Sequence, residues 1–194
     1  MDFDYSKERL NLKPVTVWIL LILALNVFGQ TANTPKTNLI EVGKDAPTFS
    51  LPDLNQQYVA LRDFCGAKLN KPWINKAKQV VVVSFFATWC KPCLQEIPHL
   101  EKIKNDFAAQ GVKFLLIDVG EEEAKIKEFL TQNTINLDIL IDRYKKIAEK
   151  YDALTLPRLI VIDKNGIIRK EQKGFTNGEQ FETDLRQLLG ELLK

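Results

Sequence analysis

Two cysteines three residues apart, Cys90 and Cys93, are the side chains in this sequence best suited to chemistry. They lie within FFATWCKPCLQEIP (Phe85–Pro98), where a β-branched and aromatic run passes into a stretch with helical spacing. A cysteine at a helix N-terminus meets free backbone N–H groups and the helix dipole, which favour a thiolate. The sequence therefore predicts a redox CxxC pair. Cys90 is expected to be the exposed attacking thiol, and the more buried Cys93 is expected to resolve a mixed disulfide.

The residues next to the two cysteines fit this interpretation. Pro92 suits the first turn of a helix, where its missing N–H would have no helical partner. Lys91 adds a positive charge that favours the Cys90 thiolate further. Trp89 is expected to pack beside the site and shield it.

Zinc binding is the alternative use of a CxxC pair. The chain has three cysteines and one histidine, and neither a second CxxC nor a histidine pair at ligand spacing is present in the sequence. We therefore expect no metal. The third cysteine, Cys65, is interpreted as a buried apolar residue, with a regulatory or intermolecular thiol as the alternative. His99 is expected to be an exposed or half-exposed helix residue.

Composition narrows the class of protein. Of the 194 residues, 45% are hydrophobic and 27% are charged, which is typical of a globular domain. The formal net charge of +2 gives no indication of a nucleic-acid partner. The acidic run Glu121–Glu123 is interpreted as the solvated start of a helix, with acids at its positive end.

The N-terminus has the pattern of a targeting segment. An apolar run of 14 residues, Val15–Phe28, follows several basic residues. This length favours a signal peptide, although a retained anchor is the alternative. We expect residues 1–30 to be a signal peptide or membrane anchor, 31–40 a linker and 41–194 the folded domain. The domain is then expected to be extracytoplasmic, in the periplasm or cell envelope.

The order of predicted elements is a hairpin, then alternating strands and helices, then two antiparallel strands and a closing helix. Parallel strands joined by helices, with an antiparallel strand at one edge, indicate an α/β sandwich. A polar insert, Cys65–Lys78, separates the hairpin from the first long strand. The predicted strands are Thr48–Leu51, Tyr58–Leu61, Gln79–Phe86, Val112–Val119, Leu137–Ile141, Arg158–Asp163 and Ile167–Lys173.

The sequence SFFATWCKPCLQEIP resembles the active site of the thioredoxin superfamily, and in particular its exported branch typified by TlpA and ResA. The segment LTLPRLIVIDKNGIIRKEQKGF resembles the second signature of that family. The likeness covers roughly residues 40 to 194. It implies a thioredoxin-like three-layer sandwich with an N-terminal β-hairpin and an extra central helix, about Glu121–Asn133.

The resemblance also implies roles for residues outside the CxxC pair. Pro157 matches a proline that faces the CxxC after a cis peptide bond, where the backbone pairs with the substrate chain; an ordinary strand-start proline is the alternative. Glu96 matches an active-site glutamate that exchanges a proton with the resolving cysteine, and an exposed helix acid is its alternative. Ser84 stands where thioredoxins proper carry a buried aspartate. The catalytic candidates are Cys90, Cys93, Glu96 and Pro157, and the substrate-binding candidates are Trp89, Lys91, Pro92 and Leu156.

The expected function is that of a thiol–disulfide oxidoreductase that reduces disulfides in exported proteins, with a role in cytochrome c maturation implied by the resemblance. Its expected partners are protein disulfides and an upstream membrane or envelope dithiol donor. A monomer without a metal or organic cofactor is expected. Two alternatives share the fold: a peroxidase related to peroxiredoxins, and a non-enzymatic metal chaperone.

Overall fold

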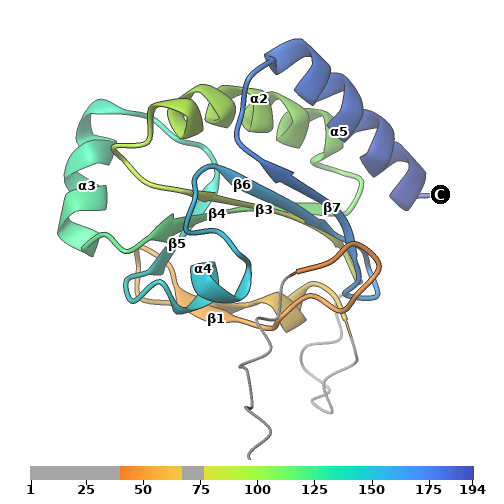
Figure 1. Ribbon diagram of the computed structural model, residues 1–194, viewed down its shortest axis with the longest axis horizontal. Helices are drawn as coiled ribbons and strands as arrows, with labels where there is room; N and C mark the ends of the chain where they lie inside the picture. Colours follow the sequence, from red (N-terminus) through yellow and green to blue (C-terminus); the bar gives the residue numbers. More distant parts are fainter. Residues whose placement is uncertain (1–39, 67–76) are drawn as a thin grey trace, which may run out of the picture. The chain divides into compact units, whose positions relative to one another are not determined.

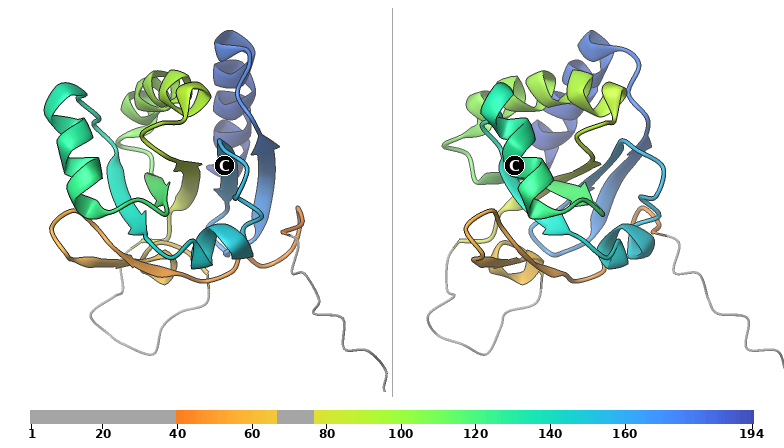
Figure 2. Two further views of the ribbon diagram at one scale, coloured as in Figure 1. Left: turned by 60° about the vertical axis from the view of Figure 1, so that its left-hand side comes forward. Right: turned by 90° about the vertical axis from the view of Figure 1, so that its left-hand side faces the viewer.

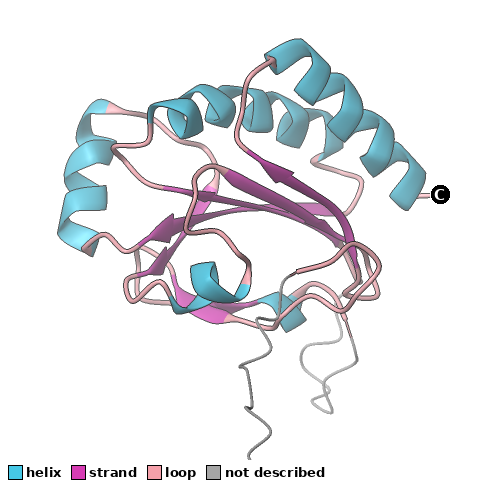
Figure 3. Cartoon of the chain, viewed as in Figure 1, coloured by secondary structure: helices cyan, strands magenta, loops and turns pink. Residues whose placement is uncertain are grey.

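The computed structural model describes residues 40–66 and 77–194 (Figures 1 and 3). The predicted targeting segment, nearly all of the predicted linker and most of the Cys65–Lys78 insert lie outside the described residues. Within the described part of the chain, no helix combines the length and apolar character needed to cross a membrane.

A five-stranded sheet forms the centre of the domain, in the order β5-β4-β3-β6-β7. Strands β3, β4 and β5 are parallel, and β6 and β7 are antiparallel to their neighbours. Every residue of β3 is buried, as expected for a central strand covered on both faces. The strands are β3 (Val80–Phe86), β4 (Val112–Val119), β5 (Asp138–Asp142), β6 (Arg158–Ile162) and β7 (Ile168–Lys173).

Helices cover both faces of this sheet, which gives three layers (Figure 2). Helices α2 (Lys91–Phe107) and α5 (Gly178–Leu192) pack on one face, and Ile126 of α3 (Glu123–Gln132) joins the same apolar cluster. Helix α4 (Lys146–Lys150) covers the other face. The hairpin β1 (Ser50–Pro52) and β2 (Tyr58–Ala60), followed by the 3₁₀ turn η1 (Leu61–Asp63), packs on that second face too.

This architecture is the predicted α/β three-layer sandwich with an N-terminal hairpin and an extra helix, α3. The carboxyl ends of β3, β4 and β5 lie at one edge of the sheet, which is where open α/β sheets place their functional residues. The cysteine pair follows β3 at this edge, and α3 begins beside it (Figure 1).

Candidate active site

The cysteine pair sits at the junction between β3 and α2, as the sequence predicts. Cys90 and Cys93 form a disulfide, with their Cα atoms 5.3 Å apart. A turn closed by a 3.0 Å hydrogen bond from Cys90 N to Ala87 O leads into α2. Cys90 is the N-cap of this helix, and its sulfur accepts a hydrogen bond from Cys93 N at 3.3 Å. The Cys90 sulfur therefore lies where the backbone N–H groups of the helix stabilise negative charge.

The expected exposure of Cys90 was wrong. Cys90 is buried, with 4% of its surface exposed, although Cys93 is buried more completely, at 0%. The disulfide and the bond from Cys93 N hold the Cys90 sulfur against the first turn of α2. Trp89 is 67% exposed, and its shielding of the pair stays a prediction. Trp89 lies in the turn between β3 and α2.

The remaining substrate-binding candidates surround the disulfide at different depths. Lys91 is exposed, and Pro92 is half-buried in the first turn of α2. Leu156 is half-buried and packs against the apolar cluster that contains both cysteines. The Leu156–Pro157 peptide bond is cis, as the resemblance implies.

Pro157 lies next to the end of β3. The following residue, Arg158, pairs with Phe85 across the sheet, and the Pro157 carbonyl accepts a hydrogen bond from Gly174 N at 2.9 Å. Pro157 itself is buried. The amino end of β6 therefore comes to the same edge of the sheet as the cysteine pair.

Glu96 is a buried acid beneath the disulfide and not an exposed one, since 1% of its surface is accessible. It lies three residues after Cys93 on α2, and this spacing puts both side chains on one face of the helix. Its Oε2 accepts a 3.0 Å hydrogen bond from Ser84 Oγ, and Oε1 has no partner among residues 40–66 and 77–194. Burial raises the pKa of Glu96 to about 7. The hydrogen bond from Ser84 lowers this pKa, but its effect is smaller than that of burial. Glu96 can therefore take up or release a proton near neutral pH.

A second acidic group lies at the same edge of the sheet, and the sequence interpretation missed it. The carboxylate of Glu121 accepts hydrogen bonds from Thr88 N at 2.6 Å and from Thr88 Oγ1 at 2.8 Å. It also pairs with Lys125 at 2.5 Å. Asp118, the seventh residue of β4, accepts a hydrogen bond from Glu121 N at 3.0 Å. Thr88 precedes Cys90 by two residues, so Glu121 contacts the segment that carries the attacking cysteine.

The acidic run was expected to be a solvated helix start, and for Glu121 this was wrong. Glu121 is buried and precedes α3, which begins at Glu123. Glu122 fits the expectation, because it is exposed and pairs with Arg143. The position of Glu121, directly after the carboxyl end of the strand next to β3, was the signal in the sequence that could have identified it.

Cys65 and His99 are the other two residues singled out in the sequence. Cys65 is buried, as interpreted, and burial raises the pKa of its thiol to about 12. His99 is half-exposed, as expected, and its Nδ1 lies 2.7 Å from Glu182 Oε1. Within the described ranges, no group of three or more histidine, cysteine, aspartate or glutamate side chains is arranged to hold a metal ion.

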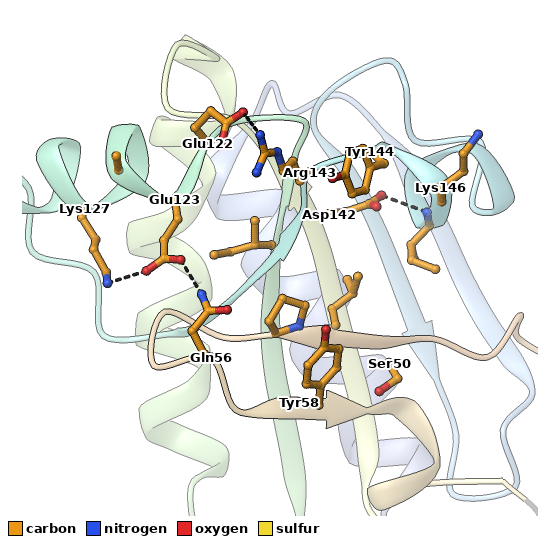
Figure 4. A pocket seen from close by; sticks show the side chains of 15 residues that line it. Ser50, Gln56, Tyr58, Glu122, Glu123, Lys127, Asp142, Arg143, Tyr144 and Lys146 are labelled. Carbon is orange, nitrogen blue, oxygen red and sulfur yellow. Dashed lines mark hydrogen bonds and ion pairs between the residues drawn. The ribbon is translucent and has the colours of Figure 1, made fainter.

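A cleft of about 880 Å³ opens beside α3, and neither cysteine of the disulfide lines it (Figure 4). The hairpin, the start of α3 and the segment after β5 form its walls. Tyr58 and Tyr144 line it and are both strongly exposed. Glu122 and Arg143 form an ion pair of 2.6 Å within it, and Glu123 receives hydrogen bonds from Gln56 and Lys127. The basic groups of this cleft are therefore largely neutralised by acidic neighbours.

Comparison with known proteins places this site in a family. Residues 42–171 match the AhpC/TSA family. The ResA thiol–disulfide oxidoreductase of Bacillus thuringiensis subsp. konkukian (strain 97-27) is 31% identical over 173 residues, which cover 88% of this chain and 93% of the relative. The ResA protein of Geobacillus thermodenitrificans (strain NG80-2) is 32% identical over 184 residues, covering 94% of this chain and 98% of the relative.

A solved structure is similar in fold. The crystal structure of a Chlorobium tepidum protein, assigned as the thiol:disulfide interchange protein DsbE, has a TM-score of 0.68 and 24% sequence identity. The match covers 80% of this chain and 99% of that one. The fold is thus thioredoxin-like. The relatives named here are disulfide-exchange proteins, which does not favour the peroxidase or metal-chaperone alternatives. The chain belongs to the AhpC/TSA family and is a thiol–disulfide oxidoreductase.

Proposed function

We propose that this enzyme reduces disulfides in exported proteins through a mixed disulfide at Cys90 that Cys93 resolves. The Cys90 thiolate attacks one sulfur of the client disulfide, and the other client sulfur leaves with the bonding electron pair and takes up a proton. The Cys93 thiolate then attacks the Cys90 sulfur and releases the second client thiol. Two electrons pass to the client, and the Cys90–Cys93 disulfide remains. The observation that carries this proposal is the position of Cys90 at the N-cap of α2, with its sulfur bonded to Cys93 N.

Glu96 is proposed to exchange the proton of the resolving cysteine. A buried carboxyl with a pKa of about 7 is ionised in part at neutral pH, so it can accept the Cys93 proton. The Ser84 hydroxyl binds one carboxyl oxygen and leaves Oε1 free for this exchange. Cys93 and Glu96 lie one helical turn apart, and both are buried from water.

Client binding is assigned to the residues around the disulfide. The exposed indole of Trp89 provides a large apolar surface beside Cys90, and exposed Lys91 provides a charge. Pro92 and half-buried Leu156 contribute further apolar surface. The backbone beside Pro157 is proposed to pair with an extended client segment, as a strand is added to a sheet edge.

The biological setting is part of the proposal. Residues 1–30 are assigned to a signal peptide or anchor, 31–40 to a linker and 41–194 to the catalytic domain. The domain is assigned to the periplasm or cell envelope, where it receives electrons from a membrane or envelope dithiol donor and acts as a monomer. Support of cytochrome c maturation is the proposed pathway.

Trapping the mixed disulfide tests the proposal. Full-length protein carrying Cys93→Ser is incubated with an oxidised protein client and analysed by mass spectrometry. We expect a stable disulfide between Cys90 and the client, because no resolving thiol is present. Cys90→Ser should form no such adduct, and Cys65→Ser is the matched control that should exchange as the unaltered protein does. An adduct through Cys65, or equal trapping by Cys90→Ser, would exclude the proposed order of attack.

A further inference from the structure

The strongest unexplained feature of the described residues is the pair of acids at the carboxyl end of β4. Glu121 uses both carboxylate oxygens on one residue, Thr88, through its amide and its hydroxyl. Hydrogen bonds to an ionised acceptor are roughly twice as strong as neutral ones. Two such bonds to one residue fix its position and its orientation. Thr88 lies within the turn from Ala87 to Cys90, so Glu121 fixes the approach of the chain to Cys90.

Asp118 holds Glu121 from the other side. Its Oδ1 accepts the Glu121 backbone N–H at 3.0 Å, and burial, together with the negative charge of the nearby Glu121 carboxylate, opposes ionisation of Asp118 and raises its pKa. Asp118 is wholly buried, and its Oδ2 has no hydrogen-bond partner among the described residues. Between the two residues the chain passes through Gly120, at φ +85°, where a Cβ would come within 2.2 Å of the Lys145 side chain. This glycine lets Glu121 turn back over the end of β4.

We propose that Asp118 and Glu121 share one proton and act as positioning residues that hold Thr88, and through it Cys90, at the N-terminus of α2. In this arrangement protonated Asp118 donates to the Glu121 carboxylate, and the carboxylate accepts from Thr88. The inference rests on the proposed role of Cys90 as the attacking thiol. It adds that the reactivity of Cys90 depends on acids that do not touch it.

The charges around the pair support one shared proton. Lys125 pairs with Glu121 from α3 and favours its ionised form. The neighbours of Asp118 on β3 and β5 are Phe86 and Ile141, which are apolar. Helix α2 contributes Glu96 to the same face of the sheet, but its carboxyl is bonded to Ser84. Asp118 is buried next to an acid that Lys125 keeps ionised, so Asp118 keeps its proton at neutral pH.

The pKa directions agree with this assignment. Burial, together with the contact with Glu121, raises the pKa of Asp118 to about 8. Burial would also raise the pKa of Glu121, but the bonds from Lys125 and Thr88 hold it below its usual value. The proton therefore resides on Asp118 at pH 7. It is lost above about pH 8, where repulsion between the two carboxylates weakens the hold on Thr88.

The first test measures the rate of alkylation of Cys90 by iodoacetamide in the reduced, full-length protein at pH 7. Glu121→Gln should lower this rate about tenfold, since charge-assisted bonds of this kind contribute that order of effect. Asp118→Asn should be alkylated at nearly the rate of the unaltered protein, because its amide still donates to Glu121. The alkylation rate of Asp118→Leu should fall as much as that of Glu121→Gln. Glu122→Gln is the matched control, because Glu122 is exposed and faces Arg143 in the cleft (Figure 4).

The proposal predicts that Glu121→Gln slows alkylation of Cys90, and an increase in this rate would overturn it. If Glu121 acted through charge alone, its removal would lower the pKa of Cys90 and speed alkylation. Equal or faster reaction of Glu121→Gln than of Glu122→Gln therefore excludes the positioning role. Thr88→Val loses the hydrogen bond from the hydroxyl and keeps the one from the backbone amide, so its alkylation rate should fall about threefold. This variant provides the test if Glu121→Gln does not fold. Alkylation that does not occur first at Cys90 in the unaltered protein would instead refute the proposed function.

The second test follows the Thr88 amide by NMR during a pH titration of the oxidised protein. Cys90 and Cys93 have no proton to lose in this state. We expect the chemical shift of the Thr88 amide to change with a midpoint near pH 8. The same change is expected in Glu96→Gln, and no such change is expected in Asp118→Asn. A Thr88 signal that does not titrate near pH 8, or that still titrates in Asp118→Asn, would exclude the shared proton.

Discussion

The hydroxyl of Ser84, in the middle of β3, donates a 3.0 Å hydrogen bond to Oε2 of Glu96 on α2, and both residues are buried. A central strand and the helix that begins with the cysteine pair are therefore linked by a polar contact inside the apolar core. Burial opposes ionisation of Glu96, and the Ser84 bond favours it. The balance places the pKa of this acid at about 7, which suits proton exchange at neutral pH.

Replacing Glu96 by glutamine should slow resolution of the mixed disulfide. The amide cannot accept the Cys93 proton, and loss of a general base costs about 100-fold in typical enzymes. Rapid mixing of the reduced protein with an oxidised client, followed by acid quenching, measures the lifetime of the Cys90 adduct. Glu101→Gln, on the same helix but bonded to Asn136 N at its outer side, is the control and should leave the lifetime unchanged. Equal lifetimes in the two variants would remove Glu96 from the mechanism.

Glu96 should also give the fold a measurable dependence on pH. The pKa of Glu96 is higher in the folded protein than its unfolded value of 4.5. The contribution of Glu96 to the free energy of unfolding is therefore fully present below pH 4.5 and is lost as the pH rises through about 7. At 1.36 kcal/mol per pKa unit, the loss is about 3 kcal/mol. We expect Glu96→Gln to gain about this much free energy of unfolding, relative to the unaltered oxidised protein, between pH 4 and pH 8. Urea unfolding measures the difference, and a difference that is constant with pH would contradict the burial argument.

Removing the Ser84 hydroxyl should shift the titration of Glu96. Without its donor, the ionised form of Glu96 loses stabilisation, so Ser84→Ala should raise the Glu96 pKa above about 7. The carboxyl ¹³C signal of Glu96 in the oxidised protein reports this titration directly. A pKa that stays the same or falls would show that the 3.0 Å contact does not act on the ionised carboxylate.

Truncating Trp89 should affect client binding and leave stability unchanged. The side chain is 67% exposed, so Trp89→Ala should change the free energy of unfolding by no more than about 0.5 kcal/mol. An exposed indole at a binding surface often contributes more than 1 kcal/mol, and kcat/KM for a protein client should fall about tenfold. Reduction of a small disulfide should proceed at the original rate. A loss of stability on the scale of a core tryptophan, about 3 kcal/mol or more, would show that the indole packs against the protein instead.

Much of the fold could be predicted because its signals are local. The β-branched and apolar run over Val112–Val119 has the same bounds as β4, and the CxxC pair lies at the predicted strand-to-helix junction. The antiparallel return of the chain after Lys164–Gly166 is confirmed by the pairing of β6 with β7. Each of these features depends on residues adjacent in the sequence.

The features that were missed depend on contacts between distant segments. Glu121 and Thr88 are 33 residues apart, and apart from its place just after β4 nothing in the sequence distinguishes Glu121 from its exposed neighbour Glu122. The burial of Cys90 follows from its disulfide and from its position at the N-cap of α2, and the exposed Trp89 lies in the turn that precedes this helix. Periodicity identifies which residues belong to an element, but it does not show which loops meet at its end.

The reduction potential of the Cys90–Cys93 couple in the full-length protein tests the central claim most directly. The protein is equilibrated with dithiol buffers of known potential, and the trapped thiols are assigned by mass spectrometry. A two-electron couple between these cysteines at or below about −250 mV is expected of an enzyme that donates electrons to client disulfides. A value near −120 mV, about that of a strong oxidant, would reverse the proposed direction of electron flow, and a couple that runs through Cys65 would contradict the assigned site.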